Sequence, residues 1–131
     1  DMPFSGNPKF EGYWVRSADI TYADTGTTVG AINVPANTFV AHVISKVTAA
    51  FSTGGYVDIG DGDDPDGWIT NIQTLVSDGT LAIRTGTGGS SVYAYAGKGY
   101  LTADTIDVQP VESTAGSLFI AAYLLPLGDM D

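Results

Sequence analysis

The sequence has no cysteine, few cations and no long apolar run. The lack of cysteine excludes disulfides, thiolate zinc sites and thiol nucleophiles. Five Lys and Arg stand against fifteen Asp and Glu, which gives a net charge of −10. This balance argues against nucleic-acid and membrane partners, because phosphates require clustered positive charge. No apolar run approaches the roughly 18 residues of a membrane-spanning helix, so none is expected.

The chain of 131 residues is long enough for one domain. Residues 1–12 contain two prolines and two phenylalanines and are expected to form an extended arm ahead of a single β-domain over residues 13–131. The side chains of Phe4 and Phe10 need apolar surroundings. Two interpretations stay open: the arm covers the open end of its own domain, or it docks on a neighbouring subunit.

Seventeen glycines among many Thr, Val and Ile residues indicate short strands separated by turns. One window, Gly67 to Asp78, has apolar residues near helical spacing and is expected to hold one or two helical turns. Gly86 to Ser90 is expected to be a hairpin turn, since it lacks the Lys of a phosphate-binding loop. The expected strands are Tyr13–Tyr22, Thr27–Val34, Thr38–Phe51, Gly55–Gly60, Thr80–Thr85, Ser91–Ala96, Gly99–Val108 and Ser117–Leu125. This number and spacing predict an all-β, antiparallel two-sheet sandwich that is jelly-roll-like.

Two strands carry most of the packing information. Thr38–Phe51 alternates between an apolar and a mixed face, and its length suggests a bulge or bend partway. Ser117–Leu125 is apolar on both faces. We therefore expect the last strand to lie at the centre of a sheet or in an interface.

An acidic loop, which has five carboxylates within nine residues, is the most prominent polar feature. Charges this close repel one another, so the loop must be solvated or hold a cation. The spacing does not fit an EF-hand, and Asp is also a common turn residue. Both a solvated turn and a calcium site remain open. The candidate calcium ligands are Asp58, Asp61, Asp63, Asp64 and Asp66.

Catalysis has little support in the residues. The single histidine, His42, lies within a strand and has no evident nucleophile or orienting acid beside it in the sequence. We therefore expect no enzymatic activity and interpret His42 as a strand or interface residue. Aromatic residues are many, and Tyr93 and Tyr95 beside the glycine-rich turn are the pair expected to be exposed. Exposed Tyr and Trp can anchor protein interfaces or stack on sugars.

Several segments together resemble a family, the small β-sandwich virion surface proteins of tailed bacteriophages, found as head decoration (cement) proteins, head fibres and tail-fibre modules. The resemblance covers about two-thirds of the chain and excludes the arm. The segments that carry it are Val47-Thr48-Ala49-Ala50-Phe51, Tyr56–Asp61, Asp64–Ile69, Tyr100–Ile106 and the last strand up to Leu125.

This resemblance implies a cement protein on the outer head surface, where a homotrimer would bind the major capsid protein and stabilise contacts between capsomers. The candidate contact residues are Phe4, Phe10, Trp14, His42 and Tyr123. The alternative is a carbohydrate- or receptor-binding module of a tail fibre or a cellular protein. In that case the aromatic residues and the acidic loop would form the site.

Overall fold

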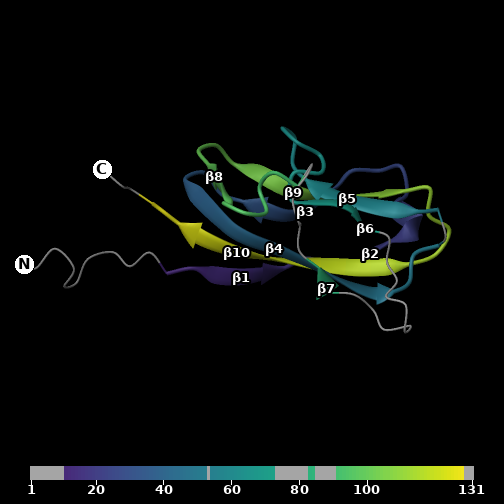
Figure 1. Cartoon of the computed structure of the whole chain (residues 1–131). Helices are drawn as coiled ribbons and strands as arrows, with labels where there is room; N and C mark the ends of the chain where they lie inside the picture. The colour runs from purple at the N-terminus through teal and green to yellow at the C-terminus, as the bar shows by residue number, and fades with distance from the viewer. Residues whose placement is uncertain (1–10, 53, 73–82, 85–90, 129–131) are drawn as a thin grey trace, which may run out of the picture.

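The computed structural model describes residues 11–52, 54–72, 83–84 and 91–128. This part of the chain forms ten strands and one short 3-10 helix (Figure 1). They are β1 (Tyr13–Arg16), β2 (Ile20–Thr21), η1 (Tyr22–Asp24), β3 (Val29–Val34), β4 (Thr38–Ala49), β5 (Tyr56–Gly60), β6 (Ile69–Ile72), β7 (Ile83–Arg84), β8 (Lys98–Tyr100), β9 (Asp104–Val111) and β10 (Ser117–Pro126).

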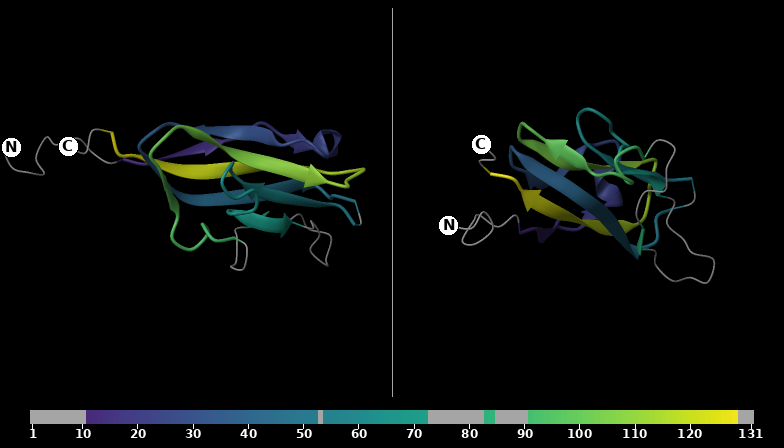
Figure 2. Two further views of the ribbon diagram at one scale, coloured as in Figure 1. Left: turned by 90° about the horizontal axis from the view of Figure 1, so that it is seen from above. Right: turned by 60° about the vertical axis from the view of Figure 1, so that its left-hand side comes forward.

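The strands form two antiparallel sheets that pack face to face, as the side views show (Figure 2). Sheet A has the order β1-β10-β4-β7, with β2 also pairing with β10 and β8 with β4. Sheet B has the order β3-β9-β5-β6. The chain passes repeatedly from one sheet to the other, and this strand order is that of a jelly roll. The predicted all-β sandwich is confirmed.

Alternating apolar residues close the space between the sheets. On β10, Leu118, Ile120, Ala122 and Leu124 are fully buried, and the residues between them face outward and are half-buried. β10 lies between β1 and β4, so the predicted central position of this strand is confirmed. Among the described residues, no helix has the length and hydropathy of a membrane span.

The expected irregularity in the longest strand is present in β4. Its pairing with β10 shifts between Tyr123 and Leu124, which lie opposite His42 and Val40. Because an extra residue reverses the alternation, Val40 faces inward before the bulge and Val43 faces inward after it. The inward set therefore differs from the one that a regular strand would give.

Two expected elements are corrected. Residues 69–72 of the expected helix form β6, since Trp68 N–H donates to Ile59 O and Ile69 pairs with Ile59. The expected strand Ser91–Ala96 forms consecutive turns, closed by Gly97 N–H donating to Tyr93 O. Residues 73–78 of the expected helix and the Gly86–Ser90 turn lie outside the described residues.

Two further strands are each divided in two. Tyr13–Tyr22 breaks after β1 because the Ser17 hydroxyl accepts the Ile120 N–H in place of a ladder carbonyl. The expected strand Gly99–Val108 falls into β8 and β9, which belong to different sheets.

Candidate functional site

The acidic loop is organised around one buried carboxylate, Asp61, whose side chain is 0% exposed. Its Oδ1 accepts the backbone N–H groups of Asp63 and Asp64 at 3.0 and 2.9 Å. The same oxygen accepts the Tyr93 hydroxyl at 3.1 Å. The backbone of the loop and a side chain from a distant turn thus converge on one oxygen.

The second oxygen of Asp61 binds side chains from β8, across the sandwich. Lys98 Nζ donates to Oδ2 at 2.6 Å and the Tyr100 hydroxyl donates at 2.7 Å. Trp68 Nε1 donates in turn to the Tyr100 oxygen at 3.1 Å. Lys98 also donates to Asp63 at 3.1 Å. These contacts tie the loop after β5 in sheet B to β8 in sheet A.

The directions of the pKa shifts of Asp61 and Lys98 indicate that both groups are charged. Burial alone would raise the pKa of Asp61, but hydrogen bonds from Lys98 and Tyr100 hold it below its usual range. Burial would lower the pKa of Lys98, and its bonds to Asp61 and Tyr93 instead raise it. Burial and the Asp61 charge raise the pKa of Tyr100. The network is a charged, hydrogen-bonded connection between the two sheets.

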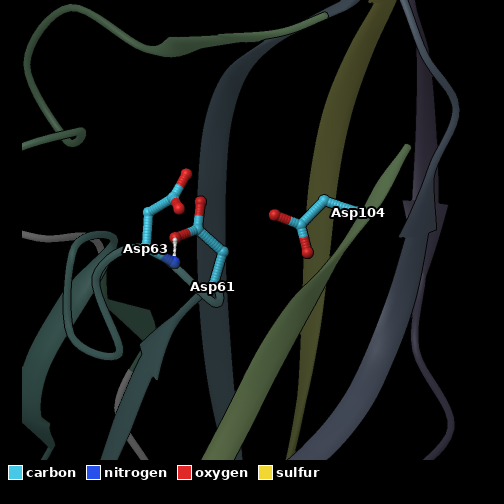
Figure 3. Close-up of side chains that lie close together, drawn as sticks. All are labelled: Asp61, Asp63 and Asp104. Carbon is cyan, nitrogen blue, oxygen red and sulfur yellow. Dashed lines mark hydrogen bonds between the residues drawn. The ribbon is translucent and has the colours of Figure 1, made fainter. Parts of the chain in front are cut away.

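Carboxylates from the acidic loop and from β9 approach each other beside this network. Asp61, Asp63 and Asp104 present oxygens within 4.8 Å of one another (Figure 3). A cation already lies at two of them, because the Lys98 ammonium binds Asp61 and Asp63. Both oxygens of Asp61 accept protein donors. The arrangement is therefore that of an internal ion pair.

The other candidate calcium ligands lie outside this group. Asp64 accepts the Asp66 N–H, and the Thr70 hydroxyl reaches the carboxylate of Asp66. Asp58 lies on β5. Burial and the neighbouring Asp64 raise the pKa of Asp66. Calcium binding by Asp58, Asp61, Asp63, Asp64 and Asp66 stays a prediction, of which the structure assembles only the part at Asp61 and Asp63.

Tyr93 and Tyr95 differ in environment, although the sequence analysis paired them. Tyr95 is 78% exposed. Tyr93 is half-buried, which corrects the expectation of exposure. It packs edge-on against Trp68 at 5.3 Å between ring centroids, and its hydroxyl bonds to Asp61. The turn at 91–97 directs the two rings to different surroundings, so they do not form a pair.

Three of the candidate contact residues form one row across sheet A. Trp14 on β1 pairs with Tyr123 on β10, which pairs with His42 on β4. The Trp14 and Tyr123 rings are 5.2 Å apart and tilted by 58°. The backbone at Gly12 lies against the Tyr123 ring. The other two candidates, Phe4 and Phe10, lie outside the described residues.

Further rows extend this outward surface, which we call the outer face of sheet A. Register partners on neighbouring strands point to the same side of a sheet. Arg16 pairs with Ala121 and Ala121 with Ile44. The guanidinium of Arg16 lies 3.7 Å from the centroid of the Phe119 ring. On β1, β4 and β10, the outward residues that define this face are Trp14, Arg16, Phe39, His42, Ile44, Lys46, Phe119, Ala121, Tyr123 and Leu125.

The sequence analysis missed several of these residues. Phe119 and Leu125 were recognised only as members of an apolar strand face, Ile44 only as part of the mixed face of Thr38–Phe51, and Arg16 was not singled out. The outward apolar face of the last strand was the available signal. The role of Lys98 had no local signal, because its partner Asp61 lies 37 positions away in the chain.

The solved structures most informative for comparison come from phage particles. Matching chains occur in "Acidic stable capsid structure of Helicobacter pylori bacteriophage KHP30" (TM-score 0.59, 14% identity, 88% of both chains covered). Others occur in "Cyanophage Pam1 capsid asymmetric unit" (TM-score 0.62, 14% identity, 92% of this chain and 89% of that one) and "Capsid of Ralstonia phage GP4" (TM-score 0.56, 13% identity, 88% and 84%).

No protein-family model and no curated protein matches the sequence. At 13–14% identity, the likeness to the three capsid structures establishes a shared fold over most of each chain. This chain has the jelly-roll fold of chains found in phage capsids.

Proposed function

We propose that this protein is a structural, non-enzymatic component of a phage virion. The observation that carries the proposal is that its fold matches chains from three phage capsid structures over 88–92% of its length. Fold alone does not determine function. The outer face of sheet A adds a second reason, because an apolar sheet face that the described residues leave uncovered is typical of a protein that is buried against another.

Within the virion, we propose that the chain is a decoration protein on the outer surface of the head. It would act as a homotrimer that binds the major capsid protein and stabilises the contacts between capsomers. Several copies bound to neighbouring capsomers would combine many individually weak contacts. The small size and the net charge of −10 suit a soluble subunit that is added to a preformed shell.

A structural role also accounts for the polar groups. The acidic loop uses its buried carboxylate and Lys98 to join the two sheets, and His42 lies beside Tyr123 on the outward surface. In the alternative sugar-binding interpretation, the aromatic residues and the acidic loop would form the site, with Tyr93 and Tyr95 as the pair expected to be exposed. Tyr93 is engaged with Trp68 and Asp61, so that pair is unavailable.

The proposal is tested with heads of the phage that encodes this chain, assembled without it. Purified protein is added, and bound copies are counted by quantitative mass spectrometry while head rupture is followed on heating. We expect saturable binding in multiples of three per site and rupture at a higher temperature.

Heads that bind the protein without gaining stability would limit the proposal to a virion component. Absence of the protein both from mature particles and from reconstituted heads would overturn it. Light scattering of the free protein tests the trimer separately.

A further inference from the structure

Positive and negative charges are segregated between the two sheets. Four of the five Lys and Arg residues of the chain lie in strands of sheet A: Arg16, Lys46, Arg84 and Lys98. None of the described strands of sheet A contains Asp or Glu. Sheet B shows the reverse, because its described strands contain Asp58, Asp104 and Asp107 and no Lys or Arg. A chain of net charge −10 therefore has one face without acidic strand residues.

The charges of the outer face of sheet A lie around an apolar centre. Phe119, Ala121 and Ile44 occupy the middle rows, with Lys46 opposite Phe119. Lys46 is exposed, and it forms no ion pair with any residue in the described part of the chain. Arg16 stacks on Phe119 and pairs with Asp19 at 3.1 Å, with both side chains more than half exposed. The cations are accessible to a partner.

A second copy of this chain fits this surface poorly. Two outer faces of sheet A packed against each other would bring Lys46 and Arg16 of both copies into one interface, and like charges in an interface are costly. Packing the face on sheet B of another copy would match charge. It would place the apolar rows against a face that is mostly polar on its two central strands, where Asp58, Thr105, Asp107 and Gln109 point outward beside Tyr56 and Val111. Such a contact is heterologous, and it closes into a ring only where the rotation between copies allows it.

We propose that the outer face of sheet A docks on a different protein, at an apolar patch flanked by carboxylates. The aromatic and aliphatic rows would bury against the patch, while Lys46 and Arg16 would pair with the flanking acids. This inference rests on the proposed function in that the docking partner is the shell of the head. Beyond the proposed function, it specifies the face of the molecule that is bound and the chemistry of the surface that binds this face.

The test uses single cysteines, which are specific labels because the chain has none of its own. Ala121→Cys places a thiol at the centre of the outer face of sheet A. Gln109→Cys is the matched control, since it also lies on a central strand, points outward and is half-buried, but on sheet B. Labelling rates with a maleimide are measured for each variant, free and bound to heads assembled without the native chain.

We expect head binding to slow labelling of Ala121→Cys at least tenfold and to leave Gln109→Cys within about twofold. Both thiols should react readily in the free protein. Protection of Gln109→Cys but not Ala121→Cys would overturn the inference and leave the proposed function intact. Protection of Ala121→Cys in the free protein would show that a second copy covers the face, and would also overturn it. If no variant and no native protein binds heads, the proposed function fails and the inference fails with its partner.

A charge series tests the flanking acids. Lys46→Gln removes a positive charge and Gln109→Glu adds a negative one, so both variants change the net charge of the chain by −1. We expect Lys46→Gln to weaken binding to heads several-fold and Lys46→Glu by about tenfold or more, with a weaker dependence on salt. Gln109→Glu should bind as the native protein does. Equal binding by Lys46→Glu and the native protein would contradict acidic flanks on the partner.

Discussion

The outer face of sheet A and the acidic loop differ in whether their groups find partners within the chain. The loop has the greater density of charge, yet Asp61 receives donors at both oxygens from within the chain. The outer face of sheet A has few charges, yet no described strand covers its apolar rows, and Lys46 forms no ion pair within the described residues. The charges of the acidic loop are therefore bound within the molecule, whereas the outer face of sheet A is available to another molecule.

The largest expected effect on stability comes from substitutions on the two sides of β10, one of which is buried and the other outward. Ile120 is fully buried between the sheets, whereas its neighbour Phe119 faces outward. We expect Ile120→Ala to lower the free energy of unfolding by about 4 kcal/mol and Phe119→Ala by about 1 kcal/mol, measured by urea denaturation. Similar losses in both variants would mean that the outward face is also covered within the molecule.

The acidic loop allows a similar comparison, because two of its carboxylates bind Lys98 but differ in burial. Asp61 is buried and Asp63 has a side chain that is 80% exposed. We expect Asp61→Ala to cost about 3 kcal/mol, because it leaves Lys98 and the Tyr100 hydroxyl without their partner. Asp63→Ala should change stability by less than about 1 kcal/mol. If both variants unfold at the same urea concentration, the network does not hold the sheets together.

The pH dependence of stability isolates the contribution of Asp61. Its folded pKa is lowered, so its contribution to stability is complete above the unfolded value of about 4 and is lost as the pH falls through the folded pKa. The raised pKa values of Asp66 and Asp107, both due first to burial, act in the opposite sense and add stability as the pH falls.

We therefore expect the native protein to be most stable on the acid side of neutrality and to lose stability below about pH 4. Asp61→Asn keeps the size of the side chain and removes the titration, so it should be less stable at pH 7 and show a weaker acid loss. Unfolding free energies across this range provide the measurement. Parallel curves for the two proteins would exclude Asp61 as the cause.

The smallest effect concerns a polar group inside sheet A. The Ser45 hydroxyl is buried and has no hydrogen-bond partner among the described residues. A buried hydroxyl without a partner loses its hydration without compensation. We expect Ser45→Ala to raise the unfolding free energy by a few tenths of a kcal/mol, up to about 1 kcal/mol. Destabilisation in calorimetry would show that the hydroxyl has a partner in solution.

Sequence patterns were most informative where burial follows strand alternation. The two apolar sides of β10 predicted its central place, and the length of β4 predicted its bulge. The position of the bulge was not predictable, because it depends on pairing with Tyr123 and Leu124, some 80 residues away. Which of the adjacent residues of β4 faced inward could not be derived without it.

Long-range polar contacts were the part that sequence could not supply. The acidic loop was visible in the sequence, but its cation comes from β8 and its phenols from Tyr93 and Tyr100. Tyr93 was paired with Tyr95 by spacing alone, and the turn that separates them has no strand periodicity. Apolar spacing also favoured a helix at Gly67–Asp78, where pairing with Ile59 produces β6.

The central claim is that the outer face of sheet A is an interface in the assembled particle. A cryo-electron microscopy reconstruction of the virion that carries this chain tests it most directly. The account predicts that β1, β4 and β10 face the shell, with carboxylates near Lys46, while β5, β9 and the acidic loop face solvent. A reconstruction in which Phe119, Ala121 and Tyr123 face solvent and sheet B contacts the shell would contradict it.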